Sequence, residues 1–249
     1  MSFQFGNKLS TSGLILSLDA GSPGSYIQNT STAATWVDIG RYSINSRYSI
    51  GDVQFSSNFN GYFAFNGTGA NSYTKSDYGD RNTTLDIGAA SLTIEVFVRI
   101  KGSVTGAGVI YQYGFTAKDT PTSATSYGLA VQSDRLAIIT SAAGIRTISG
   151  TGTKITPNQW QHLVAVYDQP NIRTFSYING VAAGNDAGNI TIAAGSNRLA
   201  NYSVGAKTDG ATTTNQIAAD IAIVKVYNRA IADTEVLNNY LFYRNRFNV

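Results

Sequence analysis

Apolar and polar residues alternate along most of this chain, and a two-residue period is the signature of a β-strand. The pattern is clearest between Trp160 and Val181, where two alternating runs flank the turn-forming segment 168–171. The second run ends at Asn179-Gly180, a dipeptide that strongly favours a tight hairpin turn. This stretch therefore predicts three consecutive antiparallel strands, the third beginning near Val181.

Other segments with the same alternation predict strands through the rest of the chain. The clearest are 13–19, 62–65, 92–101, 109–113, 127–131, 135–140 and 217–227. In segment 92–101 the even-numbered positions are apolar, and Glu95 falls on the opposite face. Three polar stretches without periodicity, 70–90, 115–126 and 207–215, predict loops.

The period changes near the C-terminal end. Val236, Leu237, Tyr240 and Leu241 recur at helical spacing, and Asp233 stands where a capping residue is favoured. This predicts a helix over 233–244. No repeat of 20–50 residues is present, which excludes a solenoid or a propeller. We expect a polar arm over 1–12 and a single domain over 13–249.

Motifs in family order along the chain give a resemblance to the laminin G-like, or concanavalin A-like lectin/glucanase, domains. They are Trp36-Val-Asp38, Phe63-Ala-Phe65-Asn-Gly67, Leu92-Thr-Ile94-Glu95-Val-Phe97-Val98, Trp160-Gln-His162, Tyr167-Asp168, Tyr177-Ile-Asn179-Gly180, Val204-Gly205-Ala206 and Ile221–Ala230 followed by Glu235. The resemblance implies an all-β fold, a two-sheet antiparallel jelly-roll sandwich of the concanavalin A-like type with a short C-terminal helix. The sequence departs from the family pattern at Phe97, where Trp is usual, and at Ala219-Asp220, where Phe-x-Gly is usual. Both departures affect how a strand packs.

Both ends of the chain are similar to a narrower subgroup, the laminin G-like proteins of tailed bacteriophage virions. The first strand runs into Leu18-Asp19-Ala20-Gly21, a Trp-x-Asp follows at 36–38, and the chain closes just after Arg246-Phe247. This resemblance implies a virion protein assembled in the host cytoplasm.

Composition narrows the range of partners. The net charge of +3 comes from scattered Lys and Arg residues without a basic run, so we expect no nucleic-acid partner. No apolar segment is long enough to span a membrane. Cysteine is absent, which excludes disulfides and thiolate metal sites and suits a reducing compartment.

The residues that could support catalysis are few. Glycosidases of this fold need two neighbouring carboxylates, but the chain has two Glu residues in all, Glu95 in a strand and Glu235 in the predicted helix. Its single histidine, His162, lies beside Trp160 in a core strand, where a packed imidazole is the simpler interpretation. We therefore predict that the chain is not an enzyme and has no catalytic residues.

Loop residues supply candidate binding sites, because long loops on a rigid sandwich often carry function. Candidates for a saccharide site are Tyr73, Asp77, Tyr78 and Asp80, with Tyr113 and Tyr202 as further possible stacking platforms. Candidates for a calcium site are Asp119, Asp209 and Asn215, although none shows the ligand spacing of an EF-hand. As turn residues they need no metal, and we expect no other cofactor.

Together these observations predict a structural protein of a bacteriophage virion, a capsid decoration or head-fibre protein that self-associates and contacts other virion proteins. The alternative is a carbohydrate-binding adhesin or tail receptor-binding module that recognises surface glycans.

Overall fold

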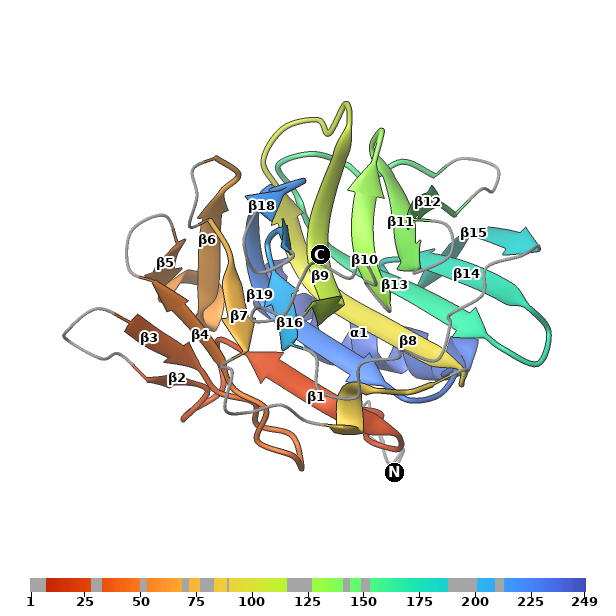
Figure 1. Ribbon diagram of the computed structural model, residues 1–249, viewed down its shortest axis with the longest axis horizontal. Helices are drawn as coiled ribbons and strands as arrows, with labels where there is room; N and C mark the ends of the chain where they lie inside the picture. Colours follow the sequence, from red (N-terminus) through yellow and green to blue (C-terminus); the bar gives the residue numbers. More distant parts are fainter. Residues whose placement is uncertain are drawn as a thin grey trace, which may run out of the picture.

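The computed structural model describes residues 8–27, 33–49, 53–68, 72–76, 83–88, 90–115, 127–140, 144–148, 153–187, 201–208 and 213–249. These residues form two large antiparallel sheets, a small two-stranded sheet and a C-terminal α-helix (Figure 1). In this part of the chain, no helix combines the length and the apolar character needed to cross a membrane.

The first large sheet, sheet A, has the strand order β15-β14-β13-β8-β19-β6-β5, and β1 also pairs with β19. Its strands are β1 (Leu14–Asp19), β5 (Val53–Ser56), β6 (Tyr62–Asn66), β8 (Leu92–Ile100), β13 (Trp160–Asp168), β14 (Arg173–Ile178), β15 (Val181–Ala187) and β19 (Ala218–Tyr227). The long strands β8, β13 and β19 occupy its centre, and β1 and β6 share one edge of β19.

The second large sheet, sheet B, has the order β12-β11-β10-β9-β16-β7-β4-β3-β2. Its strands are β2 (Tyr26–Ile27), β3 (Ala33–Trp36), β4 (Ser46–Ser49), β7 (Thr74–Ser76), β9 (Ala107–Phe115), β10 (Tyr127–Gln132), β11 (Arg135–Thr140), β12 (Gly144–Thr147) and β16 (Asn201–Val204). The small sheet pairs β17 (Lys207–Thr208) with β18 (Thr213–Thr214). Two short 3₁₀ turns are η1 (Asn58–Asn60) and η3 (Thr83–Leu85).

The main hydrophobic core lies between the two large sheets. It takes every second residue of β8, together with inward-facing residues such as Leu163 of sheet A and Tyr202 of sheet B, neither of which is exposed. Trp36 is fully buried, with its ring centroid 4.6 Å from that of Phe63. The predicted two-sheet antiparallel sandwich is thus confirmed, since each sheet buries one face against the other.

The predicted hairpins are present as β13, β14 and β15. Asn179 and Gly180 have φ values of 52° and 76°, and left-handed backbone at both central residues is what a type I′ turn requires. A Cβ atom on Gly180 would lie 3.0 Å from Cδ1 of Tyr240, so the turn also needs glycine because it lies against the helix.

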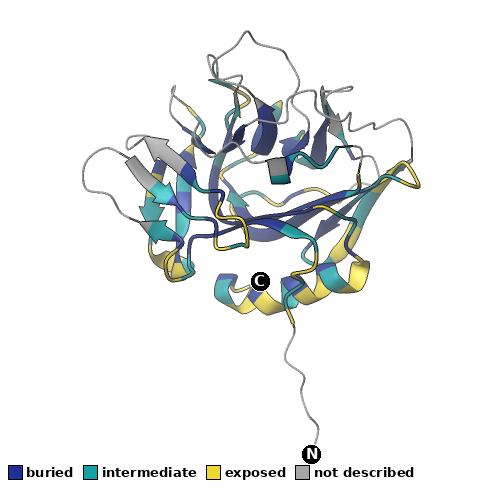
Figure 2. Cartoon of the chain, turned by 60° about the horizontal axis from the view of Figure 1, so that its bottom comes forward, coloured by how far each residue is buried: buried dark blue, intermediate teal, exposed yellow. Residues whose placement is uncertain are grey.

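The C-terminal helix α1 (Asp233–Phe247) packs on the outer face of sheet A (Figure 2). Its buried residues are Val236, Asn239, Tyr243 and Phe247, spaced by three or four positions. The helix is confirmed, but it ends at Phe247 rather than at residue 244. The apolar positions that predicted the helix are not all buried, because Leu237 is 41% exposed, and the polar Asn239 takes a buried position.

The predicted cap of this helix is also wrong. The N-cap residue is Ala232, and the carboxylate of Glu235 accepts its backbone N–H at 3.0 Å, which satisfies one of the free donors of the first turn. Asp233 is already helical, and its carboxylate accepts a hydrogen bond of 2.6 Å from the hydroxyl of Tyr177.

Both ends of the described chain meet on α1. Ser10 donates its backbone N–H to Oδ1 of Asn239 at 2.9 Å and its hydroxyl to Glu235 at 2.6 Å. Residues 1–7 of the predicted arm lie outside the described residues. Near the other end of α1, Arg246 pairs with Asp19 at 2.6 Å and donates to the backbone oxygen of Gly61 at 2.7 Å. Asp19 and Arg246, which belong to the two terminal motifs similar to the phage subgroup, therefore contact each other.

Candidate functional site

Three ionisable residues, Glu95, His162 and Lys225, lie close together beneath α1. Glu95 and Lys225 are direct cross-strand neighbours on β8 and β19, and His162 Nε2 lies 3.2 Å from Glu95 Oε1. All three side chains are fully buried. From the helix, Asn239 donates its Nδ2 hydrogen to Glu95 Oε2 at 2.7 Å, and the Tyr227 hydroxyl lies 3.1 Å from the same oxygen.

Electrostatics in this buried cluster favour an ionised Glu95. Burial alone would raise the pKa of Glu95, but the charge of Lys225, the nearby His162 and the hydrogen bond from Asn239 outweigh it and hold the pKa at about 2. Burial lowers the pKa of Lys225, and the charge of Glu95 opposes that shift. The Lys225 amine lies 4.4 Å from the centre of the Tyr243 ring, which is a cation–π contact.

This cluster attaches α1 to sheet A and offers no opening to a ligand. Helix residues cover it, and neither Glu95 nor His162 has any exposed surface. Within the described residues, the hydrogen-bond partners of the Glu95 carboxylate are an amide and a phenol, and no second carboxylate contacts it. A paired-carboxylate arrangement is therefore not formed at Glu95.

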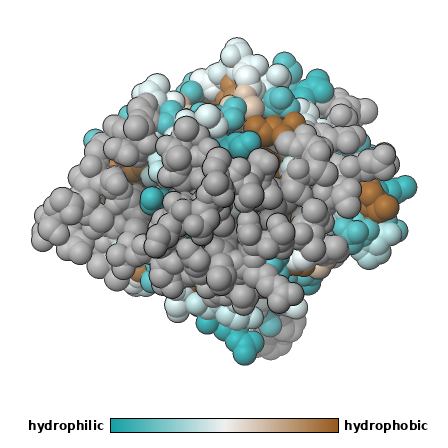
Figure 3. All heavy atoms as spheres, in the orientation of Figure 1, coloured by the Kyte–Doolittle hydropathy of each residue, from teal (hydrophilic) through white to brown (hydrophobic). Residues whose placement is uncertain are grey.

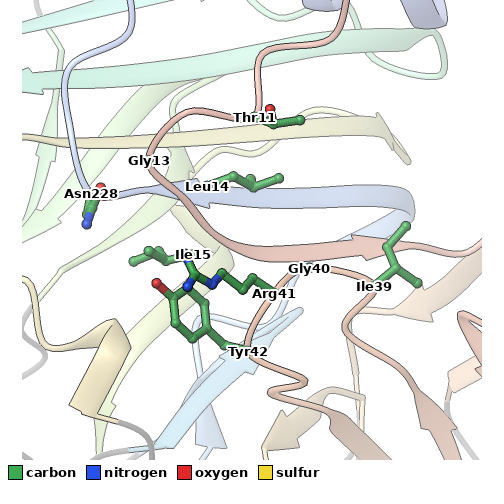
Figure 4. Close-up of a pocket in the computed structure, with 9 residues that line it drawn as sticks. All are labelled: Thr11, Gly13, Leu14, Ile15, Ile39, Gly40, Arg41, Tyr42 and Asn228. Carbon is green, nitrogen blue, oxygen red and sulfur yellow. The ribbon is translucent and has the colours of Figure 1, made fainter.

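An open pocket of about 450 Å³ lies where β1 begins (Figure 4). We call it the Arg41 pocket; its lining consists of Thr11, residues 13–15, residues 39–42 and Asn228. The side chains of Arg41 and Tyr42 both extend toward Ile15 (Figure 4). Tyr42 is 39% exposed, and the Arg41 guanidinium carbon lies 5.9 Å from the centre of its ring.

A buried carboxylate fixes the loop that carries these two side chains. Asp38 is 3% exposed, and its oxygens accept backbone N–H groups from Ser17 at 2.8 Å, Gly40 at 2.8 Å and Ile44 at 2.9 Å. Burial raises the pKa of Asp38, and these three bonds oppose that shift. Because the bonds tie both ends of the loop to β1, Arg41 and Tyr42 are presented from a braced backbone.

Most of the residues predicted for binding lie outside the described residues. These are Asp77, Tyr78 and Asp80 for a saccharide, and Asp119 and Asp209 for calcium. Tyr73 is described and is half-buried beside β7, away from the lining of the Arg41 pocket. The structure does not test these residues as a group.

The remaining predicted residues have structural roles. Asn215 is exposed and donates its side-chain amide to the oxygen of Ala107 at 3.2 Å, while its own backbone oxygen accepts Val109 N–H at 2.8 Å. Across the described ranges, no group of three or more acidic or histidine side chains could hold a metal ion. The prediction of Tyr113 and Tyr202 as stacking platforms is wrong, because both rings are buried in the core.

The sequence did not predict the Arg41 pocket, because the residues that line it are distant along the chain. The pairing of β1 with β19 brings Asn228 beside Gly13, and the hydrogen bonds of Ser17 with Asp38 and Ile39 bring residues 39–42 to β1. One signal was available in the family motif Trp36-Val-Asp38, which stands directly before the loop.

Comparison with known proteins decides the family. The family model of the concanavalin A-like lectin/glucanase superfamily matches residues 68–237, more than half of the 249 residues. The chain belongs to the concanavalin A-like lectin/glucanase superfamily. The predicted family is thereby confirmed, and the two-sheet sandwich is that of its jelly-roll members. A search of curated protein sequences finds no match to this chain.

Solved structures share the fold at low identity. A Trypanosoma rangeli sialidase in complex with sialic acid has a TM-score of 0.62 at 16% identity, covering 94% of this chain and 33% of the sialidase. The receptor binding domain of botulinum neurotoxin type G has a TM-score of 0.60 at 16% identity, covering 92% of this chain and 51% of that domain. This lectin-like chain therefore spans about a third of the sialidase and about half of the neurotoxin domain.

The prediction that the chain is not an enzyme is contradicted by these comparisons, since sialidases are among the chains that share its fold. The prediction rested on missing catalytic residues in the sequence, and the superfamily holds both glucanases and lectins. At 16–18% identity the likeness shows the fold alone, so the activity of those sialidases is not established for this superfamily member.

Proposed function

We propose that this chain is a carbohydrate-binding module carried on the surface of a bacteriophage virion, with saccharides bound in the Arg41 pocket. The observation that carries the binding part is the pocket itself, an open site with an exposed aromatic ring and polar side chains on a braced loop. Its volume of about 450 Å³ falls within the range of about 300–1,000 Å³ that is usual for small-ligand sites.

The side chains in the pocket match the chemistry of a sugar. The Tyr42 ring offers an apolar face on which the C–H side of a pyranose can stack, while its hydroxyl stays available for hydrogen bonds. The amide of Asn228 is exposed and can both donate to and accept from sugar hydroxyls. On the face shown in Figure 3, the described apolar side chains occur in small separate groups.

The comparisons support binding at the level of the fold. The superfamily includes lectins, one similar structure is a sialidase in complex with sialic acid, and another is a receptor binding domain. What those proteins bind is their own property, so the proposal for this chain depends on the Arg41 pocket.

A glycan array tests the binding part, using the full chain and three variants. Tyr42→Ala removes the stacking surface and Asn228→Ala removes the amide, and each is expected to abolish a saturable signal given by the unmodified protein. Phe242→Ala is the matched control, because Phe242 is an aromatic residue, 50% exposed, that lies on α1. A blank array for the unmodified protein, or equal loss in the control, would overturn the proposal.

The virion part of the proposal is supported by the resemblance of both chain ends to the phage subgroup. The two motifs also contact each other, since Asp19 of the first pairs with Arg246 of the second. We propose a capsid decoration or head-fibre position, with other copies of the chain and other virion proteins as partners and assembly in the host cytoplasm.

Gold-labelled antibody against this chain, applied to particles from the source lysate and viewed by electron microscopy, tests the location. Label on heads supports a decoration or head-fibre protein, and label on tails supports a receptor-binding module instead. Particles without label would overturn the virion part and leave the carbohydrate part to the glycan array.

A further inference from the structure

The Arg41 pocket has a positive charge that nothing in the described chain neutralises. No Asp or Glu side chain lines it, and Arg41 makes no hydrogen bond or ion pair with any described residue. A guanidinium stays protonated at every relevant pH, so this charge is permanent.

Three other arginines of the protein, Arg99, Arg229 and Arg246, are paired with carboxylates. Arg99 contacts Asp220, Arg229 contacts Glu235 at 2.6 Å, and Arg246 contacts Asp19 at 2.6 Å. Each of these has a carboxylate as its partner, which is the acceptor that fits the planar fork of a guanidinium best. Arg41 differs from these three because, among the described residues, it forms no ion pair with a carboxylate and no Asp or Glu lines its pocket.

The acid closest in sequence to Arg41 is used elsewhere. The Asp38 carboxylate is buried and is occupied by backbone N–H groups of Ser17, Gly40 and Ile44. These bonds occupy both carboxylate oxygens of Asp38 while they brace the loop. The backbone of the loop is therefore fixed before a ligand binds, which reduces the entropy lost on binding. The charge of Arg41 remains available to the ligand.

We infer that the Arg41 pocket selects saccharides that carry a carboxylate, such as uronic or nonulosonic acids. This inference rests on the proposed carbohydrate-binding function and names its ligand class. The sugar carboxylate accepts hydrogen bonds from the Arg41 guanidinium, the ring stacks on Tyr42, and hydroxyls reach the Asn228 amide. The guanidinium lies close to the Tyr42 ring, so a single sugar can engage both groups.

The test compares two sugars that differ at one position, glucuronic acid and glucose, each presented as the same glycoside. Titration calorimetry of the full chain is expected to show at least about tenfold tighter binding of the acid, the gain expected of a charged hydrogen-bonded pair at a pocket mouth. The preference is expected to shrink as salt is added, because solvent-exposed charges are screened.

Variants separate this inference from the proposed function. Arg41→Gln removes the charge and is expected to bring acid and neutral sugar to equal affinity, while Arg41→Lys keeps part of the preference. Arg173→Gln is the control, because Arg173 is exposed on β14, outside the pocket lining. A sulfated neutral glycoside serves as a further arm, and tighter binding of the sulfate than of the uronic acid would overturn the carboxylate assignment.

The remaining outcomes are distinct. Equal binding of the acidic and neutral sugars by the unmodified protein, lost in Tyr42→Ala, would overturn this inference and leave the proposed function standing. Binding of neither sugar, together with a blank glycan array, would overturn both.

Discussion

Two regions of the protein hold charged side chains in opposite ways. Beneath α1, Glu95, His162 and Lys225 are fully buried and contact one another or the helix. At the Arg41 pocket an exposed guanidinium has no carboxylate partner among the described residues. Charged side chains that contact one another in the interior hold elements of the fold together, whereas a charged side chain exposed on a braced loop is available to a ligand. Glu95 and His162, which were candidates for catalysis in the sequence, therefore attach helix α1 to sheet A.

The largest effect is expected from breaking the buried cluster. Glu95→Ala would leave Lys225 and His162 buried beside a cavity without their carboxylate, and we expect a loss of about 3–5 kcal/mol in the free energy of unfolding. Urea titration followed by tryptophan fluorescence measures it. Glu95→Gln retains an oxygen for Asn239 and should lose less, and a loss below about 1 kcal/mol in Glu95→Ala would contradict a stabilising role.

A smaller effect is expected at the contact between the terminal motifs. Arg246→Ala removes the pair with Asp19 and the bonds to two backbone oxygens, so we expect a loss of about 2–3 kcal/mol, in line with hydrogen bonds to a charged group. The exposed Arg173→Ala is the control and should change stability by less than about 0.5 kcal/mol. Equal losses in the two variants would show that the terminal contact contributes nothing specific.

The next effect concerns acid pH and the pair between Arg229 and Glu235. The two side chains form two hydrogen bonds, of 2.6 and 2.8 Å, and these lower the pKa of Glu235 to about 2 from its usual 4.5. Between these values the unfolded chain binds more protons than the folded one, so stability falls as the pH is lowered through this window.

Because the pair is partly exposed, its contribution is expected to be about 1 kcal/mol or less. Unfolding measured from neutral pH down to about pH 2 should show the stability of the unmodified protein converging with that of Glu235→Gln. Glu95 titrates in both proteins, so the difference between them isolates Glu235. A difference that stays constant with pH would exclude the ionised carboxylate as its origin.

The smallest effect on stability belongs to the pocket. Arg41→Gln and Tyr42→Ala alter exposed side chains and should shift the free energy of unfolding by less than about 0.5 kcal/mol, while glycan binding is lost or loses its preference for acids. Thermal unfolding and binding measured on the same samples check this. A large destabilisation would mean that these side chains support the fold and would remove the contrast between the two regions.

Local signals predicted the strands and hairpins well. The period-two runs and the Asn179-Gly180 turn depend on neighbours in the sequence, so β13, β14 and β15 could be located without the structure. Features set by distant partners could not. The last turn of α1 persists because Arg246 and Phe247 meet residues from the first third of the chain, and no helical pattern encodes that.

The candidate site was harder to predict for the same reason. Tyr113 and Tyr202 alternate with polar residues. This alternation does not say which face of a strand points inward, so the sequence allows both rings as surface platforms. The Arg41 pocket joins residues more than two hundred positions apart, Thr11 and Asn228 among them. Only Asp38 stood in a motif, and its work in bracing the loop depends on backbone groups that a sequence does not display.

The position of β19 has a consequence for how the chain reaches its fold during synthesis. This strand lies between β8 on one side and β1 and β6 on the other, so β1 and the β5–β6 hairpin have no place in sheet A until residues 218–227 have left the ribosome. Until then, apolar strand edges made early in translation stay unpaired, a state prone to aggregation. Pairs that are far apart in the sequence, such as Leu14 with Tyr227, also predict slow refolding. The chain loses entropy when these distant segments come together, before their contacts stabilise it.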